Sequence, residues 1–294
     1  MIRLDAATVL LQWATGGLAF LWVTTRRREV GIGYGWLLRI VFGLLALAAL
    51  ATGRLVEPVA GRDLAAAFVA VSTGVALTSS IVRRKAGVAG ERTRRERRAA
   101  RVEAMVGSEP AGDGRSAMRG REDEEARAVG REFPPILDVV APLVGLVGLV
   151  FAAAAAGGPP GLALVRTLAG AIFLGAVTDA MLLGHWYLVQ PGLGRAPLRE
   201  LNRWLALTWP VEVGALLWPV GMLSVLSGRI NDGWGGTLGW FWVACAVTTI
   251  ALTAVTRAAL RERAYSAVMA ATGLLYLAIL TAFGTDVVAR AILA

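Results

Sequence analysis

The sequence predicts an all-α membrane protein: a polytopic transmembrane bundle of eight helices, with both termini outside and one long basic cytoplasmic loop between the third and fourth helices. Hydrophobic residues make up 56% of the 294 residues and charged residues only 17%, whereas a soluble domain carries about a quarter charged residues. The apolar residues form separate runs of about 20 residues, a length that crosses a hydrocarbon core of ~30 Å. The basic residues cluster between alternate runs, which is typical of a protein oriented in a membrane.

Apolar runs predict the eight helices, in the order 6–24, 36–53, 64–82, 136–156, 162–189, 204–226, 236–256 and 264–285. None of the runs alternates with a period of two, which excludes a transmembrane barrel. Helices satisfy their own backbone groups in lipid. The first run ends at Arg26 without a small-residue cleavage pattern, so we interpret it as a retained helix and not as a signal peptide.

The distribution of basic residues predicts the orientation. The segments after the first, third, fifth and seventh runs hold 23 of the 30 basic residues, and cytoplasmic loops are rich in such residues. We therefore expect these four segments in the cytoplasm, and an even number of helices then places both termini outside. All basic residues except Lys85 are arginine, a usage that suggests a GC-rich bacterium and hence a bacterial cytoplasmic membrane.

The long loop divides the chain into 1–82 with three helices, the charged segment 83–135, and 136–294 with five helices. The loop holds 14 basic and 10 acidic residues, a composition that predicts a largely disordered segment. Within it, 91–105 could form a basic helix that lies on anionic lipid or docks a cytoplasmic partner; the alternative is a solvated linker. A second way to divide the chain is into four plus four helices, which would form a parallel repeat of the kind found in some transporters. The two halves, however, share little sequence.

Ionisable residues inside the predicted helices are the main candidates for function, because each costs about 2.5–3.5 kcal/mol on insertion scales. They are Asp179 and His185 in the fifth run and Glu212 in the sixth. The short connection between these runs predicts antiparallel neighbours, so we expect Asp179 and Glu212 to share a cavity in the cytoplasmic half, with His185 at its mouth. Scattered structural roles are the alternative. A stripe of small residues predicts a close helix contact at Asp179; its members are Thr167, Ala171 and Gly175.

The end of the fifth run concentrates polar and aromatic residues. Tyr187 and Gln190 follow His185 within one and a half turns of helix. Such a group could hold a quinone or a lipid head group. It could equally be an aromatic belt at the membrane surface.

Several classes of function are excluded or disfavoured by what the sequence lacks. Cys245 is the single cysteine and His185 the single histidine, which excludes an intrachain disulfide, a cysteine metal cluster and bis-histidine haem ligation by this chain. Lys85 follows a helix, which disfavours a retinal Schiff base. We expect no cofactor, no metal and no nucleic acid bound to the chain; its partner is the lipid bilayer.

Three functions remain. The first is a membrane subunit of a bacterial electron-transfer or energy-coupling complex, which handles protons or a quinone head group near the cytoplasmic side and works with a soluble redox partner. The second is a proton-coupled transporter of small molecules. The third is a scaffold that recruits a cytoplasmic partner through its loop. We favour the first, because the evidence for a repeat is poor and because the helix number is similar to that of membrane anchor subunits of quinone-linked oxidoreductases, an analogy only. The sequence does not decide whether the protein is an enzyme.

Overall fold

The structure, a computed structural model, describes residues 5–88, 90–92, 96, 132–190, 192–219, 221–262 and 264–293. In these ranges the chain forms helices and turns and no strand. Most of the predicted basic helix at 91–105, and the linker expected after it, lie outside the described residues.

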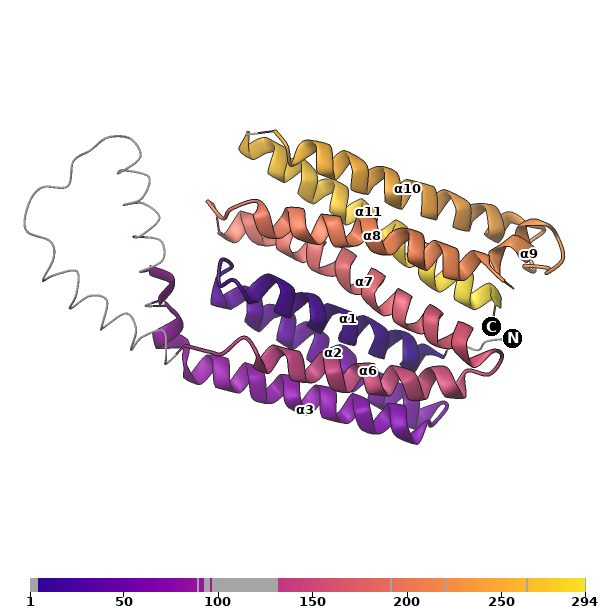
Figure 1. Ribbon diagram of the computed structural model, residues 1–294, viewed down its shortest axis with the longest axis horizontal. Helices are drawn as coiled ribbons and strands as arrows, with labels where there is room; N and C mark the ends of the chain where they lie inside the picture. The colour runs from indigo at the N-terminus through magenta and orange to yellow at the C-terminus, as the bar shows by residue number, and fades with distance from the viewer. Residues whose placement is uncertain are drawn as a thin grey trace, which may run out of the picture.

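Long helices lie side by side with nearly parallel axes (Figure 1). We call the end where α1 begins and α11 ends the terminal end, and the opposite end, where the segment 83–135 departs, the loop end (Figure 1). The helices of the described chain are α1 (Ala6–Thr25), α2 (Ile32–Leu55), α3 (Ala60–Val82), α6 (Leu137–Ala155), α7 (Pro160–Val189), α8 (Ala196–Leu217), the short α9 (Met222–Leu226), α10 (Thr237–Ala259) and α11 (Tyr265–Leu293).

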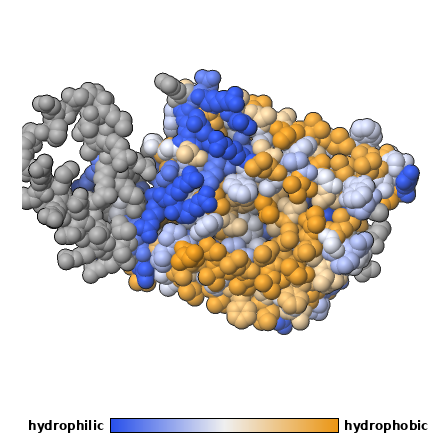
Figure 2. All heavy atoms as spheres, viewed as in Figure 1, coloured by the Kyte–Doolittle hydropathy of each residue, from blue (hydrophilic) through white to orange (hydrophobic). Residues whose placement is uncertain are grey.

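Seven of these helices are long and apolar enough to cross a membrane, and α8 is the long helix that is not among them. Asn202, Arg203 and Glu212 interrupt its apolar sequence. The surface agrees with a membrane protein, because large apolar side chains are exposed along the helices, such as Leu44 on α2 (61%) and Val71 on α3 (63%). Figure 2 shows this apolar surface over the middle of the bundle, with hydrophilic residues gathered toward the loop end.

The predicted sixth helix, 204–226, has the wrong boundaries at both ends. α8 begins at Ala196, and Pro197 lies in its first turn, where the ring's fixed φ suits a helix. The helix stops at Leu217 because Trp218 precedes Pro219, and a residue before proline avoids the helical conformation; Trp218 is extended, with φ −134° and ψ 152°. α11 is also longer than predicted and continues past residue 285 to Leu293.

Packing divides the long helices four and four. α1, α2, α3 and α6 pack in a ring in chain order, and α6 returns to α1; α7, α8, α10 and α11 form a second ring in the same way. The long loop divides the chain after α3, but α6 packs with the helices that precede the loop. The two rings, which we call the first and the second bundle, meet mainly where α1 packs on α7.

Glycine allows this close approach of α1 and α7. A Cβ atom at Gly16 would lie 1.8 Å from the main-chain oxygen of Ala171, and one at Gly175 would lie 2.3 Å from the carbonyl carbon of Gly16. Ala171 and Gly175 belong to the predicted stripe of small residues, so the expected close contact is confirmed. It fixes which face of α7 turns toward the first bundle.

Candidate functional site

Asp179 lies on α7 where the two bundles meet. Its side chain is fully buried, at 0% exposed, and neither carboxyl oxygen has a hydrogen-bond partner among the described residues. Its main-chain oxygen accepts a hydrogen bond of 3.4 Å from the Tyr34 hydroxyl of α2, and the neighbouring Thr178 hydroxyl accepts one of 2.9 Å from Trp13 Nε1 of α1. The predicted burial of Asp179 at a helix contact is confirmed.

Two polar side-chain atoms of α1 are also buried without a partner in the described part of the chain, one facing α7 and the other facing α6. They are Gln12 Oε1 and Thr15 Oγ1, both on α1. The amide nitrogen of Gln12 donates a hydrogen bond of 2.6 Å to the main-chain oxygen of Thr167 on α7. α1 and α7 therefore bring several uncompensated polar groups to the inside of the molecule.

Glu212 belongs to a separate group of four ionisable side chains. Arg290 of α11 lies at its centre: its Nε donates to Asp286 Oδ1 at 2.5 Å, and its Nη2 lies 3.6 Å from Glu212 Oε1. Nη2 also donates to the main-chain oxygen of Arg166 on α7, and Arg166 Nε donates to the main-chain oxygen of Ala215 on α8 at 2.8 Å. All four side chains are buried, and two acids face two arginines.

The shared cavity expected for Asp179 and Glu212 is wrong. Glu212 lies beside Arg166, which precedes Asp179 by thirteen residues on α7, or about 20 Å along the helix axis. The cause is the true start of α8: from Ala196, sixteen residues carry the chain about 24 Å toward the terminal end before it reaches Glu212. Asp179 lies in the half of α7 nearer to the loop end.

His185 is not at the mouth of a cavity with Asp179. Its side chain is exposed, and its Nδ1 lies 3.0 Å from the Tyr276 hydroxyl of α11, with the two rings edge to face. The main chain at Asp179 contacts Tyr34 of α2 instead. Six residues separate the two along α7, which turns them about 120° apart.

Tyr187 and Gln190 form hydrogen bonds with main-chain and side-chain groups at the loop end. The Tyr187 hydroxyl donates to the oxygen of Gly194 at 2.6 Å. Gln190 Oε1 accepts from Gly31 N and from Trp186 Nε1, both at 3.0 Å. These contacts favour structural roles that hold the α7–α8 connection and the start of α2; a ligand-binding role for the two residues stays untested.

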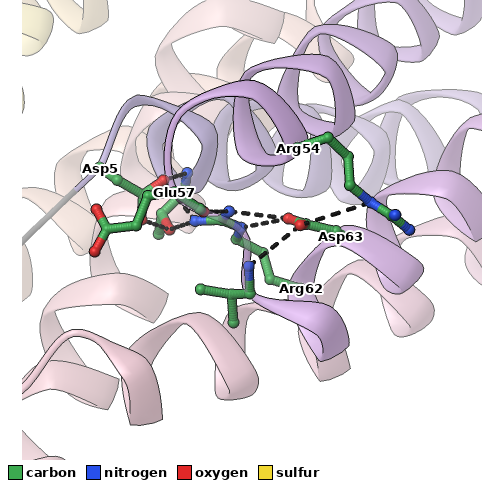
Figure 3. A network of polar contacts seen from close by, with 7 residues as sticks. Asp5, Arg54, Glu57, Arg62 and Asp63 are labelled. Atoms are coloured by element: carbon green, nitrogen blue, oxygen red, sulfur yellow. Dashed lines mark hydrogen bonds and ion pairs between the residues drawn. The ribbon is translucent and has the colours of Figure 1, made fainter.

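Other buried charges were not anticipated. At the terminal end, Arg62 lies between Asp5 and Asp63 (Figure 3), with its Nη1 2.6 Å from Asp5 Oδ1 and its Nε 2.9 Å from Asp63 Oδ1. Its Nη2 donates to the main-chain oxygen of Glu57 at 2.6 Å, and Arg54 approaches Asp63 at 3.9 Å. The network ties the start of α1 to the turn between α2 and α3.

Arg39 of α2 and Asp138 of α6 form a second buried pair, near the loop end. Two parallel hydrogen bonds of 2.8 and 2.7 Å join them, and their side chains are 3% and 2% exposed. Such bidentate pairs are among the strongest hydrogen bonds between side chains.

The sequence carried one signal for a buried pair, the i,i+4 spacing of Asp286 and Arg290, but the predicted last helix stopped at residue 285.

Comparison with known proteins identifies no relative: no family model, no curated protein and no solved structure matches the chain.

Proposed function

We propose that the chain crosses a bacterial cytoplasmic membrane eight times, with the loop end in the cytoplasm and both termini outside. α8 supports the eighth crossing, because its 22 residues pack along α7 and against α10. Arginines near the loop end support the orientation; they include Arg26, Arg203 and Arg261.

We further propose that Asp179 takes up and releases a proton inside the membrane, in a membrane subunit of an electron-transfer or energy-coupling complex. One observation carries this proposal: the Asp179 carboxyl group is fully buried at the junction of the two bundles, without a partner among the described residues. A buried carboxylate with no compensating donor is strongly disfavoured. The neutral acid is then the stable form, and the group can exchange a proton with water or with a neighbour that reaches it.

Buried polar groups farther along α7 fit a proton path that leads away from Asp179. Gln12 of α1 lies beside Arg290, since the Nε2 of Gln12 and the Nη2 of Arg290 both approach Gly170 of α7. The Gln12 Oε1 is unpaired among the described residues, and buried polar atoms of this kind commonly bind ordered water. Farther toward the outside, the Glu212–Arg290 group adds two carboxylates. A quinone head group, if one takes part, would meet the exposed His185–Tyr276 pair from the lipid, and a soluble redox partner would bind at the cytoplasmic end.

Respiration-driven proton uptake by inverted membrane vesicles tests this function. In a strain whose own copy is deleted, Asp179→Asn should support less uptake than the wild type at equal protein amount, because the amide keeps the shape but exchanges no proton. Ser72→Ala, a change on a partly exposed face of α3, should leave uptake unchanged. Equal uptake by wild type and Asp179→Asn would contradict the proposal.

A proton-coupled transporter is the second candidate, and the four-plus-four packing favours it. Transporters with parallel repeats place the substrate site between two halves that rock against each other, and Asp179 lies between the two bundles. Purified protein in liposomes distinguishes the candidates, since a transporter alone should couple proton flux to a solute gradient from a panel of amino acids, sugars and organic acids. The scaffold alternative depends on 83–135, most of which lies outside the described residues.

A further inference from the structure

Four arginines surround a cavity at the loop end of α8 and α10. The cavity has a volume of about 310 Å³, and its lining consists of Arg199, Asn202, Arg203, Arg257, Leu260 and Arg261. Two of the arginines come from the last part of α10 or directly after it, and two from the first part of α8. The four side chains belong to exposed residues, so the cavity opens to the surface.

The positive charge in this cavity is not neutralised by carboxylates. Arg203, Arg257 and Arg261 form no ion pair with any described residue, in contrast to Arg26 and Arg27 nearby, which pair with Glu200. Arg199 donates to the main-chain oxygen of Leu260, which satisfies a carbonyl at the end of α10 but leaves the charge. The charge of the cavity is therefore complementary to that of an anion.

The floor of the cavity is polar. Asn202 Nδ2 donates to the main-chain oxygen of Thr253 on α10 at 3.1 Å, while its Oδ1 is buried without a partner in the described chain. About two turns deeper along α8, Trp209 Nε1 donates to the oxygen of Ala246 at 2.9 Å. These two bonds join α8 to α10 below the arginines.

An apolar surface continues from the arginines toward the middle of the bundle. Leu207 and Val211 follow Arg203 at intervals of four residues, on the same face of α8, and are 65% and 56% exposed. Val247, on α10, is 58% exposed. A ligand with an anionic head and long apolar chains would match both the charge of the cavity and the surface below it.

We propose that this cavity binds the phosphodiester head group of an acidic phospholipid, with the acyl chains along α8. Arginine has planar donor pairs that fit phosphate oxygens, and basic pockets between membrane helices on the cytoplasmic side are typical sites for acidic lipid head groups. The inference rests on the proposed membrane topology, but not on the proton chemistry of Asp179. The bound lipid holds α8 against α10 and so stabilises the second bundle.

Native mass spectrometry of the full-length, delipidated protein tests the proposal with phosphatidylglycerol, phosphatidylcholine and inorganic phosphate as probes. The protein should bind phosphatidylglycerol at a lower lipid concentration than phosphatidylcholine. The double variant Arg203→Gln/Arg257→Gln should weaken phosphatidylglycerol binding about tenfold or more. Arg84→Gln/Lys85→Gln is the matched control, since it removes two exposed positive charges from the same end of the bundle and should have little effect.

Three results would overturn the proposal. Equal binding of the two lipids would show that the head-group charge is not recognised. Equal weakening by the control variant would reduce the effect to general surface charge. Competition by inorganic phosphate at the concentration at which phosphatidylglycerol binds would identify a soluble anion as the ligand. All four substituted positions are exposed, and thermal unfolding of each variant verifies that it is folded. The lipid-binding results do not depend on whether Asp179→Asn loses proton uptake, so either proposal can fail without the other.

Discussion

Gly16 and Gly175 set the distance between the two bundles. Because neither residue has a side chain, the backbones of α1 and α7 approach to a separation that leaves no room for a single methyl group. The close crossing lies one turn before Asp179 on α7. A residue with no functional group of its own thus controls the environment of the acid.

Gly16→Ala should therefore destabilise the protein. The added Cβ would meet the main-chain oxygen of Ala171, which cannot move without shifting α7, and overpacking of this kind costs about 1–3 kcal/mol. Thermal unfolding in detergent measures the effect as a lower midpoint. Gly74→Ala on α3 is the control: its Cβ would meet nothing within 4 Å, so the midpoint should stay the same or rise slightly. Equal midpoints for both variants would contradict the close α1–α7 crossing.

Arg290→Leu should be more damaging than the loss of an exposed arginine. It would leave Asp286 and Glu212 buried together without their shared cation, and breaking a buried ion pair in this way costs about 3–5 kcal/mol. Arg92→Gln removes one partner of the Arg92–Glu96 pair, whose side chains are 82% and 65% exposed, and should cost about 0–1 kcal/mol. Chemical denaturation compares the two. A small effect of Arg290→Leu would argue against the four-residue group.

α8 and α11 show where hydropathy loses the boundaries of a helix. Arg199, Glu200 and Arg203 look like loop residues in the sequence, yet they belong to a helix whose first turns extend beyond the apolar stretch. The predicted last helix ended before Asp286 and Arg290, although these residues form an ion pair one turn apart inside α11. Charged residues inside a helix thus conceal its ends from a hydropathy criterion, which expects apolar residues along the whole helix. The other six helices, which carry few such charges in their middle, were predicted to within a few residues.

Asp232 organises the start of α10. Its carboxylate accepts hydrogen bonds from the main-chain amides of Trp234 and Gly236, and of Leu238 and Gly239 in the first turn of α10. The bonds from Gly236 and Trp234 contribute most to a lowered pKa of this carboxyl group. A pKa below the unfolded-state value means that Asp232 stabilises the fold above that value.

The stabilisation by Asp232 should be lost as the pH falls. The unfolded value of an aspartate is about 3.9, so the contribution is complete above it and disappears as the pH drops through the lower pKa of the folded state. Asp232→Ala should lower the unfolding midpoint at neutral pH, and the difference from the wild type should shrink in acid. A difference that is independent of pH would show that charge at this position has no part in the stability of α10.

The arrangement of whole helices was only partly accessible from the sequence. Burial of Asp179 followed from the stripe of small residues that precedes it. The separation of Glu212 from Asp179 could not be predicted in this way, because it depends on where α8 begins and on Arg290. Arg290 follows Glu212 by more than 70 residues. The long loop suggested a three-plus-five division, but α6 packs with the helices before the loop, as in the alternative four-plus-four division.

Cysteine labelling tests the orientation of the whole molecule. In a background with Cys245→Ala, a cysteine introduced by Asn231→Cys should react with an impermeant reagent added to intact cells, because the exposed residue lies at the terminal end. Ser108→Cys, in the predicted cytoplasmic loop, should react only after the membrane is opened. The reverse pattern would invert the topology.

The protonation of Asp179 is the central claim, and infrared spectroscopy of the purified protein measures it directly. A neutral carboxylic acid has a carbonyl stretching band that is separate from the bands of carboxylates and amides, and transfer to D₂O shifts it when the proton exchanges. We expect such a band at neutral pH in the wild type and a shift of the band in D₂O. Its intensity should fall in Asp179→Asn and be retained in Asp286→Asn, because Arg290 pairs with Asp286. Glu212 is also fully buried, and its two oxygens have no hydrogen-bond partner among the described residues, so the comparison is one of band intensity. Absence of the band from the wild type, or equal intensity in the wild type and Asp179→Asn, would contradict the claim.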